Sequence, residues 1–305
     1  MLSVLFPGQG SQSVGMCKEF YDNFEYVKNL FKEADDILKI NITKMILEGP
    51  KENLNLTENT QPAIFLTSYS IFKVLNQESN LDLSKAKFYA GHSLGEYSAL
   101  CCAKSITFDQ TINLLEHRGK AMQNALPDGD GGMIAILGTE IEIINKILVK
   151  NNKHICYVAN DNTLGQVVVS GKKNSLNLLS EELKEKNIKS ISLPVNAPFH
   201  CPLMKNATDE MRNIILDTIF YDPIVSVISN VTASPQNKSQ EIKNLLIEQI
   251  ENPVRWRESV HNMINLGVNK FIEVGPGKIL SGLIKRIDRN IKLNQVNNLE
   301  DLKNI

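Results

Sequence analysis

The stretch Gly91-His92-Ser93-Leu94-Gly95 reads G-x-S-x-G and follows the apolar residues Phe88-Tyr89-Ala90. The residues after it, Glu96 to Leu100, favour a helix. A strand, a sharp turn and a helix in this order form a nucleophile elbow, which exposes a serine hydroxyl at the top of an α/β sheet. The pattern therefore predicts an α/β fold with Ser93 as a nucleophile. A glycine-bounded turn with an N-capping serine is an equally good interpretation of these residues alone.

Two other segments also combine an apolar strand with a glycine-rich loop. Leu2 to Phe6 precedes Pro7-Gly8-Gln9-Gly10-Ser11-Gln12, and Phe271 to Val274 precedes Gly275-Pro276-Gly277. Open parallel sheets bind ligands at the carboxyl ends of their strands. The Pro7–Gln12 loop is therefore expected at such a ligand-binding edge, and Gly275-Pro276-Gly277 is expected to end its strand ahead of a helix.

The spacing of apolar residues predicts the remaining elements of this large domain. One helix is expected from Phe20 to Leu38, and a second around Thr60 to Leu75 with Pro62 near its first turn. Thr107 and Gln110 have the form of a capping box. A helix is expected from Thr107 to Met122, and another follows the loop Pro198–Pro202 and ends at about Leu216. Beyond it we expect a strand from Ile224 to Ser229 and helices near 240–251, near 256–266 and from Ile279 onward.

A composition change at 127–132, rich in glycine and aspartate, marks a boundary. Beyond it we expect strands at 133–137, 154–158, 166–170 and 189–193, helices at 140–149 and 174–186, and a turn at 160–162. This order, β-α-β-β-α-β, is that of a ferredoxin-like unit. The prediction is an α/β-hydrolase-like catalytic domain, residues 1–127 and 195–305, with a ferredoxin-like subdomain inserted at 128–194.

Composition excludes several classes of protein. The 305 residues carry a formal net charge of -1 without long runs of one sign, so neither nucleic-acid nor membrane binding is expected. No apolar run has the length of a transmembrane helix and no secretory signal is recognisable, which favours a cytoplasmic protein. The five cysteines and five scattered histidines lack metal-site spacing, and we expect buried free thiols and no metal.

A serine nucleophile needs a base, and histidine is the usual one. His200 is the best candidate, because it lies in a proline-bounded loop and follows the serine in chain order, as in α/β-hydrolases. His92, next to Ser93, is expected to point away from the reacting face of the serine, and His117, His154 and His261 are interpreted as structural. For an oxyanion, the elbow predicts one donor at the Leu94 N–H and a second in the Gly8-Gln9-Gly10 loop. An ordinary glycine turn remains an alternative for that loop.

Several motifs appear along the chain in the order of one family. They are Phe6-Pro7-Gly8-Gln9-Gly10-Ser11-Gln12, Thr60-Gln61-Pro62, Gly91-His92-Ser93-Leu94-Gly95-Glu96, Gly165-Gln166, Phe199-His200-Cys201-Pro202-Leu203-Met204 and Glu273-Val274-Gly275-Pro276-Gly277. Together they resemble the malonyl-CoA:acyl carrier protein transacylases of bacterial fatty-acid synthesis. The resemblance covers nearly the whole chain and implies malonyl transfer through an acyl-serine.

The resemblance implies a role for each matching residue. Ser93 matches the acylated serine and His200 the general base of a Ser-His dyad, while Gln9 and Leu94 match the oxyanion donors. Arg118, by itself a solvated helix residue, matches the arginine that holds the malonyl carboxylate. Asn160 and Gln249 match substrate-site residues, and Asn230 and Gln249 match residues whose backbone carbonyls orient the histidine. Phe199 before His200 resembles malonyl-selective relatives.

The resemblance also implies partners. We expect malonyl-CoA and an acidic, phosphopantetheinylated acyl carrier protein, no bound cofactor, and a monomer. Lys285, Arg286 and Arg289 are candidate docking contacts or simply a solvated helix end. Three alternatives stay open: a serine esterase or thioesterase, a non-catalytic carrier-binding module, and an acyltransferase of a polyketide or malonate decarboxylase pathway.

Overall fold

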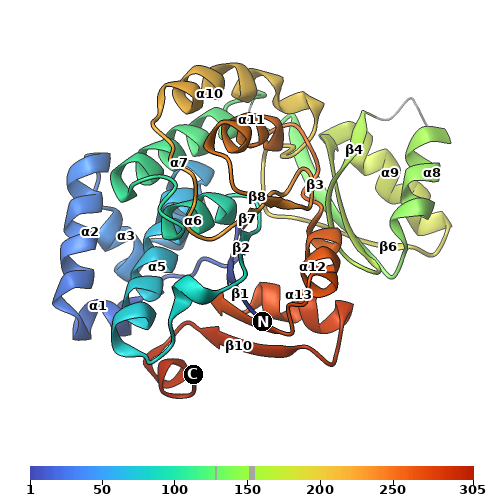
Figure 1. Ribbon diagram of the computed structural model, residues 1–305. Helices are drawn as coiled ribbons and strands as arrows, with labels where there is room; N and C mark the ends of the chain where they lie inside the picture. The colour runs from blue at the N-terminus through green and yellow to red at the C-terminus, as the bar shows by residue number, and fades with distance from the viewer. Residues whose placement is uncertain (128, 151–154) are drawn as a thin grey trace.

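The structure is a computed structural model that describes residues 1–127, 129–150 and 155–305. It contains two sheets (Figure 1). The larger has six strands in the order β10-β9-β1-β2-β7-β8, and the smaller has four in the order β4-β5-β3-β6. The large sheet is parallel apart from its edge strand β8, and the small one is antiparallel. The predicted α/β fold with a smaller inserted sheet is confirmed.

The register of the large sheet brings the predicted loops together. Strand β1 pairs with β2 so that Phe6 lies opposite Gly91, and with β9 so that Leu5 lies opposite Glu273. The loops after these strands therefore meet at one edge, as expected for parallel neighbours. The strands are β1 Leu2–Phe6, β2 Phe88–Gly91, β7 Val227–Ile228, β8 Pro235–Gln236, β9 Lys270–Val274 and β10 Lys292–Val296.

Helices cover both faces of the large sheet because successive strand residues point to opposite sides. Val4 and Phe6 face a core shared with α2, α5, α6, α7, α10 and α11, whereas Leu5 faces a second core with α12 and α13. These helices are α2 Glu25–Leu38, α5 Thr57–Glu78, α6 Gly95–Cys102, α7 Phe108–Gln123, α10 Lys205–Asp217, α11 Ser239–Gln249, α12 Trp256–Asn265 and α13 Ile279–Ile287.

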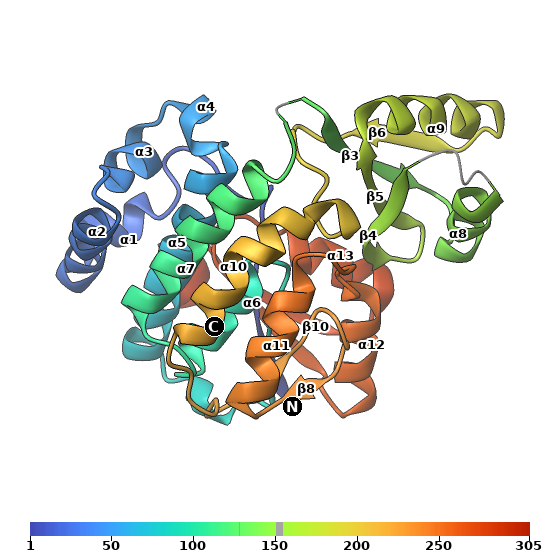
Figure 2. The ribbon, with the colours of Figure 1, turned by 90° about the horizontal axis from the view of Figure 1, so that it is seen from above.

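The small sheet lies to one side of the large one (Figure 2). Its chain order is β3 Gly131–Leu137, α8 Ile141–Lys150, β4 Cys156–Thr163, β5 Gln166–Lys172, α9 Lys173–Glu185 and β6 Lys189–Ser192, the predicted β-α-β-β-α-β. Ile134 and Val169 pack against α8 and α9 on one face. Met133 and Val168 alternate with them and line a cavity on the other face. The exact domain boundaries remain a prediction, and Asp128 lies outside the described residues.

Several predicted elements differ in detail. The Asn160-Asp161-Asn162 stretch is part of strand β4 and not a turn, with two register shifts that accommodate it, and His154 lies outside the described residues. The predicted helix 20–38 is two helices, α1 Lys18–Asn23 and α2, because Phe24 is extended. Helix α5 begins three residues early, so Pro62 lies in its second turn. Several short elements of the described chain were not predicted, among them α3 Ile42–Glu48, α4 Lys51–Leu54, β8, β10 and α14 Leu299–Lys303.

Candidate active site

Ser93 occupies the predicted nucleophile elbow between β2 and α6. Its φ of 54° lies in the left-handed region, which is costly for a residue with a side chain. Close approach explains the two flanking glycines: a Cβ on Gly95 would meet the Phe6 oxygen at 2.2 Å, and one on Gly91 would meet Gly95 at 1.9 Å. The turn is therefore tight enough to present the Ser93 hydroxyl above the sheet.

The side chain of Asn230, just after β7, holds the elbow in place. Its Oδ1 accepts from the Ser93 N–H at 2.7 Å, and its Nδ2 donates to the Gly91 carbonyl at 2.7 Å. Its backbone carbonyl accepts from the Arg255 N–H at 3.0 Å. Asn230 thus positions the serine through its amide, which differs from the predicted contact of its carbonyl with the histidine.

His200 reaches Ser93 from the loop before α10. The distance from Ser93 Oγ to His200 Nε2 is 2.8 Å, and Nδ1 lies 2.8 Å from the Gln249 carbonyl oxygen. This carbonyl fixes the tautomer with the proton on Nδ1, so that Nε2 can accept the serine proton. Burial and the nearby Arg118 cation lower the pKa of His200 to about 3, which keeps the imidazole neutral.

Arg118, on α7, is a buried cation beside the serine. Its side chain donates to Gln61 Oε1 at 2.6 Å, Gln249 Oε1 at 2.9 Å and Ser93 Oγ at 3.2 Å. All three acceptors are neutral, its Nε has no partner, and within the described ranges it forms no ion pair. Burying a charge without a counter-ion is costly. The site therefore favours an anionic group at this guanidinium.

Two donors are available for an oxyanion. The Leu94 N–H, at the start of α6, forms no hydrogen bond within the described chain. Gln9 lines the same cavity, with its Nε2 3.4 Å from Thr57 Oγ1. A Cβ on Gly8 would meet the His92 carbonyl at 2.5 Å, so this glycine lets the Gln9 loop approach the elbow. Both predicted donors thus lie beside Ser93.

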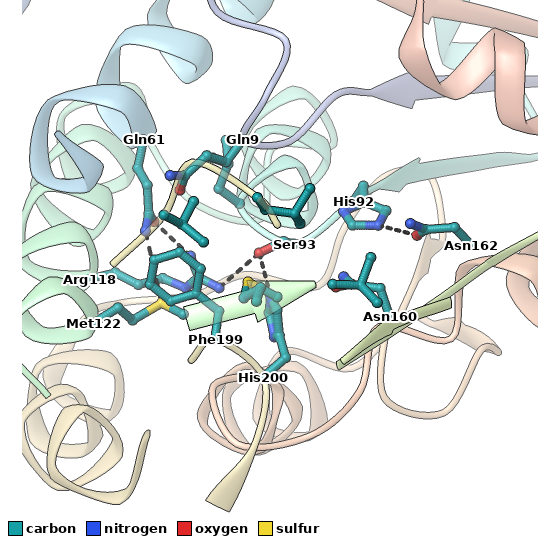
Figure 3. Close-up of a pocket in the computed structure, with 15 residues that line it drawn as sticks. Gln9, Gln61, His92, Ser93, Arg118, Met122, Asn160, Asn162, Phe199 and His200 are labelled. Atoms are coloured by element: carbon teal, nitrogen blue, oxygen red, sulfur yellow. Dashed lines mark hydrogen bonds between the residues drawn. The ribbon is translucent and has the colours of Figure 1, made fainter. Parts of the chain in front are cut away.

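Ser93, Arg118 and His200 line one cavity of about 150 Å³ (Figure 3), whereas Asn230 and Gln249 support them from outside its lining. The small sheet contributes four of the lining residues, Met133, Asn160, Asn162 and Val168. Asn160 lies buried in the wall of this cavity. The remaining lining residues are Gln9, Gln61, His92, Leu94, Met122, Leu193, Val195 and Phe199.

Three polar residues of the site were not predicted. Gln61 holds Arg118, and Asn162 Oδ1 lies 2.9 Å from His92 Nε2. Glu96 accepts from Gln249 Nε2 at 2.7 Å. Gln61 and Glu96 belong to quoted family motifs, which is the one signal that could have identified them. Asn162 was hidden by its interpretation as a turn residue.

The other described histidines lie elsewhere or have other partners. His92 packs against Trp256 at 5.6 Å between ring centroids, and burial lowers its pKa. His117 bonds to the Asn113 carbonyl and is exposed, as is His261. All five cysteines are buried and unpaired, as predicted.

In the ranges that the structure describes, no three His, Cys, Asp or Glu side chains are grouped to hold a metal ion. None of the described helices has the length and apolar character that crossing a bilayer requires.

The sequence is similar to known acyltransferases along nearly its whole length. Residues 4–297 match the acyl transferase domain family. A malonyl CoA-acyl carrier protein transacylase from Bacillus subtilis (strain 168) is 41% identical over 305 residues, 99% of this chain and 95% of the relative. The chain belongs to the malonyl-CoA:acyl carrier protein transacylase family. The resemblance drawn from its motifs is confirmed.

Solved structures of this transacylase family share the fold. An acyl-carrier-protein-S-malonyltransferase from Bartonella henselae has a TM-score of 0.96 at 39% identity, covering 99% of this chain and 97% of that one. A malonyl-transacylase in complex with a type II PKS acyl-carrier protein has a TM-score of 0.95 at 37% identity, with the same coverage. The fold is therefore that of the transacylase family throughout the chain.

Proposed function

We propose that this chain transfers the malonyl group of malonyl-CoA to the phosphopantetheine thiol of an acyl carrier protein, which supplies fatty-acid elongation. The observation that carries the proposal is the Arg118 guanidinium, buried 3.2 Å from the Ser93 hydroxyl without an ion-pair partner in the described chain. A planar guanidinium binds a carboxylate in bidentate fashion. The free carboxylate of a malonyl group fits this position, whereas an acetyl group leaves the cation unpaired.

In the first half of the reaction, His200 Nε2 takes the proton of the Ser93 hydroxyl, which attacks the thioester carbonyl of malonyl-CoA. The Leu94 N–H and Gln9 stabilise the oxyanion of the tetrahedral intermediate. As the C–S bond breaks, His200 returns the proton to the CoA sulfur, and CoA leaves as a thiol. The product is a malonyl ester of Ser93.

The second half repeats these steps with a different acceptor. A pantetheine thiol has a pKa near ~8.5 and is mostly protonated at neutral pH, so it also needs His200 as base. The thiolate attacks the ester carbonyl, the C–O bond breaks, and His200 returns the proton to Ser93 Oγ. Arg118 holds the same carboxylate throughout, which orients the carbonyl in both halves.

Substrate binding also changes the pKa of the general base His200. Arg118 is one of the causes that lower the His200 pKa, after burial. When the malonyl carboxylate pairs with Arg118, its charge offsets the cation and the His200 pKa rises. A malonyl substrate therefore strengthens its own general base, and an acetyl substrate does not.

A transfer assay tests the proposal against its rivals. We expect malonyl-CoA and phosphopantetheinylated carrier to give malonyl-carrier, and Ser93→Ala to abolish the product. Release of free malonate at a comparable rate would show an esterase or thioesterase, and no uptake of any acyl group would show a binding module. Faster transfer to a polyketide carrier would place the enzyme in a polyketide pathway. Malonate decarboxylase activity that depends on this enzyme would place it in a malonate decarboxylase pathway. We also propose that the enzyme is a cytoplasmic monomer without a bound cofactor.

A further inference from the structure

We propose that Glu96 is a positioning residue that sets the orientation of the Gln249 side-chain amide and, through it, the place of the Arg118 guanidinium beside Ser93. The inference rests on the proposed function, because it takes Arg118 as the group that binds the substrate carboxylate. It adds a residue that does not contact the reacting atoms but controls one that does.

The position of Glu96 is unusual for a glutamate. A glutamate in the first turn of a helix is ordinarily solvated, but Glu96 is 3% exposed. Its Oε2 accepts from the Asn230 N–H at 3.0 Å and from Gln249 Nε2 at 2.7 Å. One carboxylate thus joins α6, the segment after β7 and the end of α11 directly beneath the nucleophile elbow.

The Gln249 amide has a donor end and an acceptor end, and its orientation decides what Arg118 meets. In the structure Gln249 Nε2 donates to Glu96 and, at 3.1 Å, to the Ser93 carbonyl, while Gln249 Oε1 accepts from Arg118 at 2.9 Å. Glu96 Oε2 accepts from two N–H groups, of Asn230 and of Gln249, and this arrangement requires the donor end of the Gln249 amide. A reversed amide would place Nε2 against the guanidinium, where two donors would face each other.

The same glutamine serves the catalytic base. Its backbone carbonyl accepts from His200 Nδ1 at 2.8 Å, so its placement affects both the base and the guanidinium. When it is ionised, Glu96 also supplies negative charge one amide away from Arg118. Burial raises the pKa of Glu96 to about 7, against the opposing effects of the Asn230 and Gln249 hydrogen bonds and of Arg118. The amide between the two charges leaves the remaining Arg118 donors for a substrate.

The test compares Glu96→Ala with Glu96→Gln, using malonyl-CoA and acetyl-CoA as substrates of the intact enzyme. Alanine frees the Gln249 amide, so we expect KM for malonyl-CoA to rise about tenfold, the effect of losing one hydrogen bond to a charged group. The malonyl-to-acetyl ratio of kcat/KM should fall by a similar factor. Glutamine keeps an acceptor oxygen for both donors, and the ratio should stay within about threefold of wild type.

A double-mutant cycle with Gln249→Ala tests the route of the effect. If Glu96 acts through Gln249, Glu96→Ala should add little to the loss in Gln249→Ala. Glu273→Gln is the matched control: this carboxylate is also buried, but it accepts from the Leu280 and Ser281 N–H groups of α13. We expect that control to leave the malonyl-to-acetyl ratio unchanged.

Two results would overturn the inference alone: equal losses on both substrates, or additive losses in the cycle, with wild-type Ser93 still malonylated. Absence of a malonyl ester on wild-type Ser93 would overturn the proposed function as well. If Glu96→Ala does not fold, Glu96→Asp takes its place, because the shorter side chain withdraws the carboxylate from Gln249 Nε2. We then expect the malonyl-to-acetyl ratio to fall, and an unchanged ratio in Glu96→Asp would overturn the inference.

Discussion

At the scale of single residues, both reacting side chains sit on a strained backbone. Ser93 and His200 have φ values of 54° and 59°, a region that costs on the order of 1–3 kcal/mol for a residue other than glycine. The Asn230 amide holds the first and the Gln249 carbonyl holds the ring of the second. Strain kept in place by surrounding contacts is typical of a site whose geometry was selected for reaction.

Arg118→Ala removes the carboxylate partner. We expect kcat/KM for malonyl-CoA to fall about 100-fold or more, because without Arg118 the malonyl carboxylate is buried with no cation to pair with. The loss for acetyl-CoA should be smaller, since acetyl makes no such pair. Both are read from the initial rate of acyl transfer to the carrier. Arg212→Ala, an exposed arginine on α10, is the control and should change neither rate. Equal losses on the two substrates would contradict the role of Arg118.

The low pKa of His200 predicts an activity that persists in acid. The imidazole accepts a proton only when neutral, and a pKa of about 3 in the free enzyme keeps it neutral well below pH 5. Since kcat/KM reports the free enzyme, it should show no decline due to His200 between pH 8 and pH 5.

Glu96 titrates within that interval, so the pH profile is measured in Glu96→Gln as well as in wild type. A decline with an apparent pKa near the ordinary histidine value of ~6.5 that persists in this variant would contradict the assignment.

At the scale of elements, the elbow depends on contact between two backbones. Gly95→Ala would place a methyl group 2.2 Å from the Phe6 oxygen, so β1 and α6 must separate. We expect a loss of several kcal/mol in the free energy of unfolding, measured by urea denaturation, together with loss of acylation. Gly282→Ala, in helix α13 with open space around it, should instead gain up to about 1 kcal/mol. A Gly95→Ala protein as stable as wild type would refute the close packing.

The elements that the sequence predicted well are those with strong local patterns. In each of them a run of regularly spaced or continuous apolar residues lies next to a residue that starts or ends an element, such as glycine, proline or an N-capping threonine. Examples are the elbow, the buried strands Leu2–Phe6 and Lys270–Val274, and the capping box at Thr107. Strand β10, with its partly polar Lys292–Val296 run at a sheet edge, has no such pattern. Asn160-Asp161-Asn162 has turn composition, but the partners of β4 in the small sheet hold it extended.

At the scale of the whole molecule, the site exists only where distant segments meet. Ser93, Arg118, His200 and Gln249 come from four elements, and Asn160 from the small sheet completes the wall. Spacing alone predicted Ser93, His200 and Leu94, while Gln9 was one of several residues in a candidate loop. Arg118, Asn160 and Gln249 required the family resemblance, because nothing local distinguishes an arginine on an amphipathic helix. The link from Glu96 to Gln249 could be seen only in three dimensions.

A docking prediction also belongs to this scale. Lys285, Arg286 and Arg289 are exposed at the end of α13, and Arg286 donates to Gln166 Oε1 of the small sheet at 3.3 Å. An acidic carrier should approach this end faster at low salt. We expect Lys285→Glu with Arg289→Glu to lower kcat/KM for the carrier about tenfold at low salt, with little change at high salt. Lys184→Glu on α9 is the control. Rates that ignore both salt and charge reversal would exclude this surface.

In the proposed function Ser93 takes a malonyl group from malonyl-CoA and passes it to the carrier. The most direct measurement is the intact mass of the enzyme after mixing with malonyl-CoA, then after adding phosphopantetheinylated carrier, with Ser93→Ala in parallel. We expect one malonyl adduct on wild type, located at Ser93, that disappears as the carrier gains the same mass. An adduct on Ser93→Ala, or one on wild type that is lost to water while the carrier stays unmodified, would contradict it.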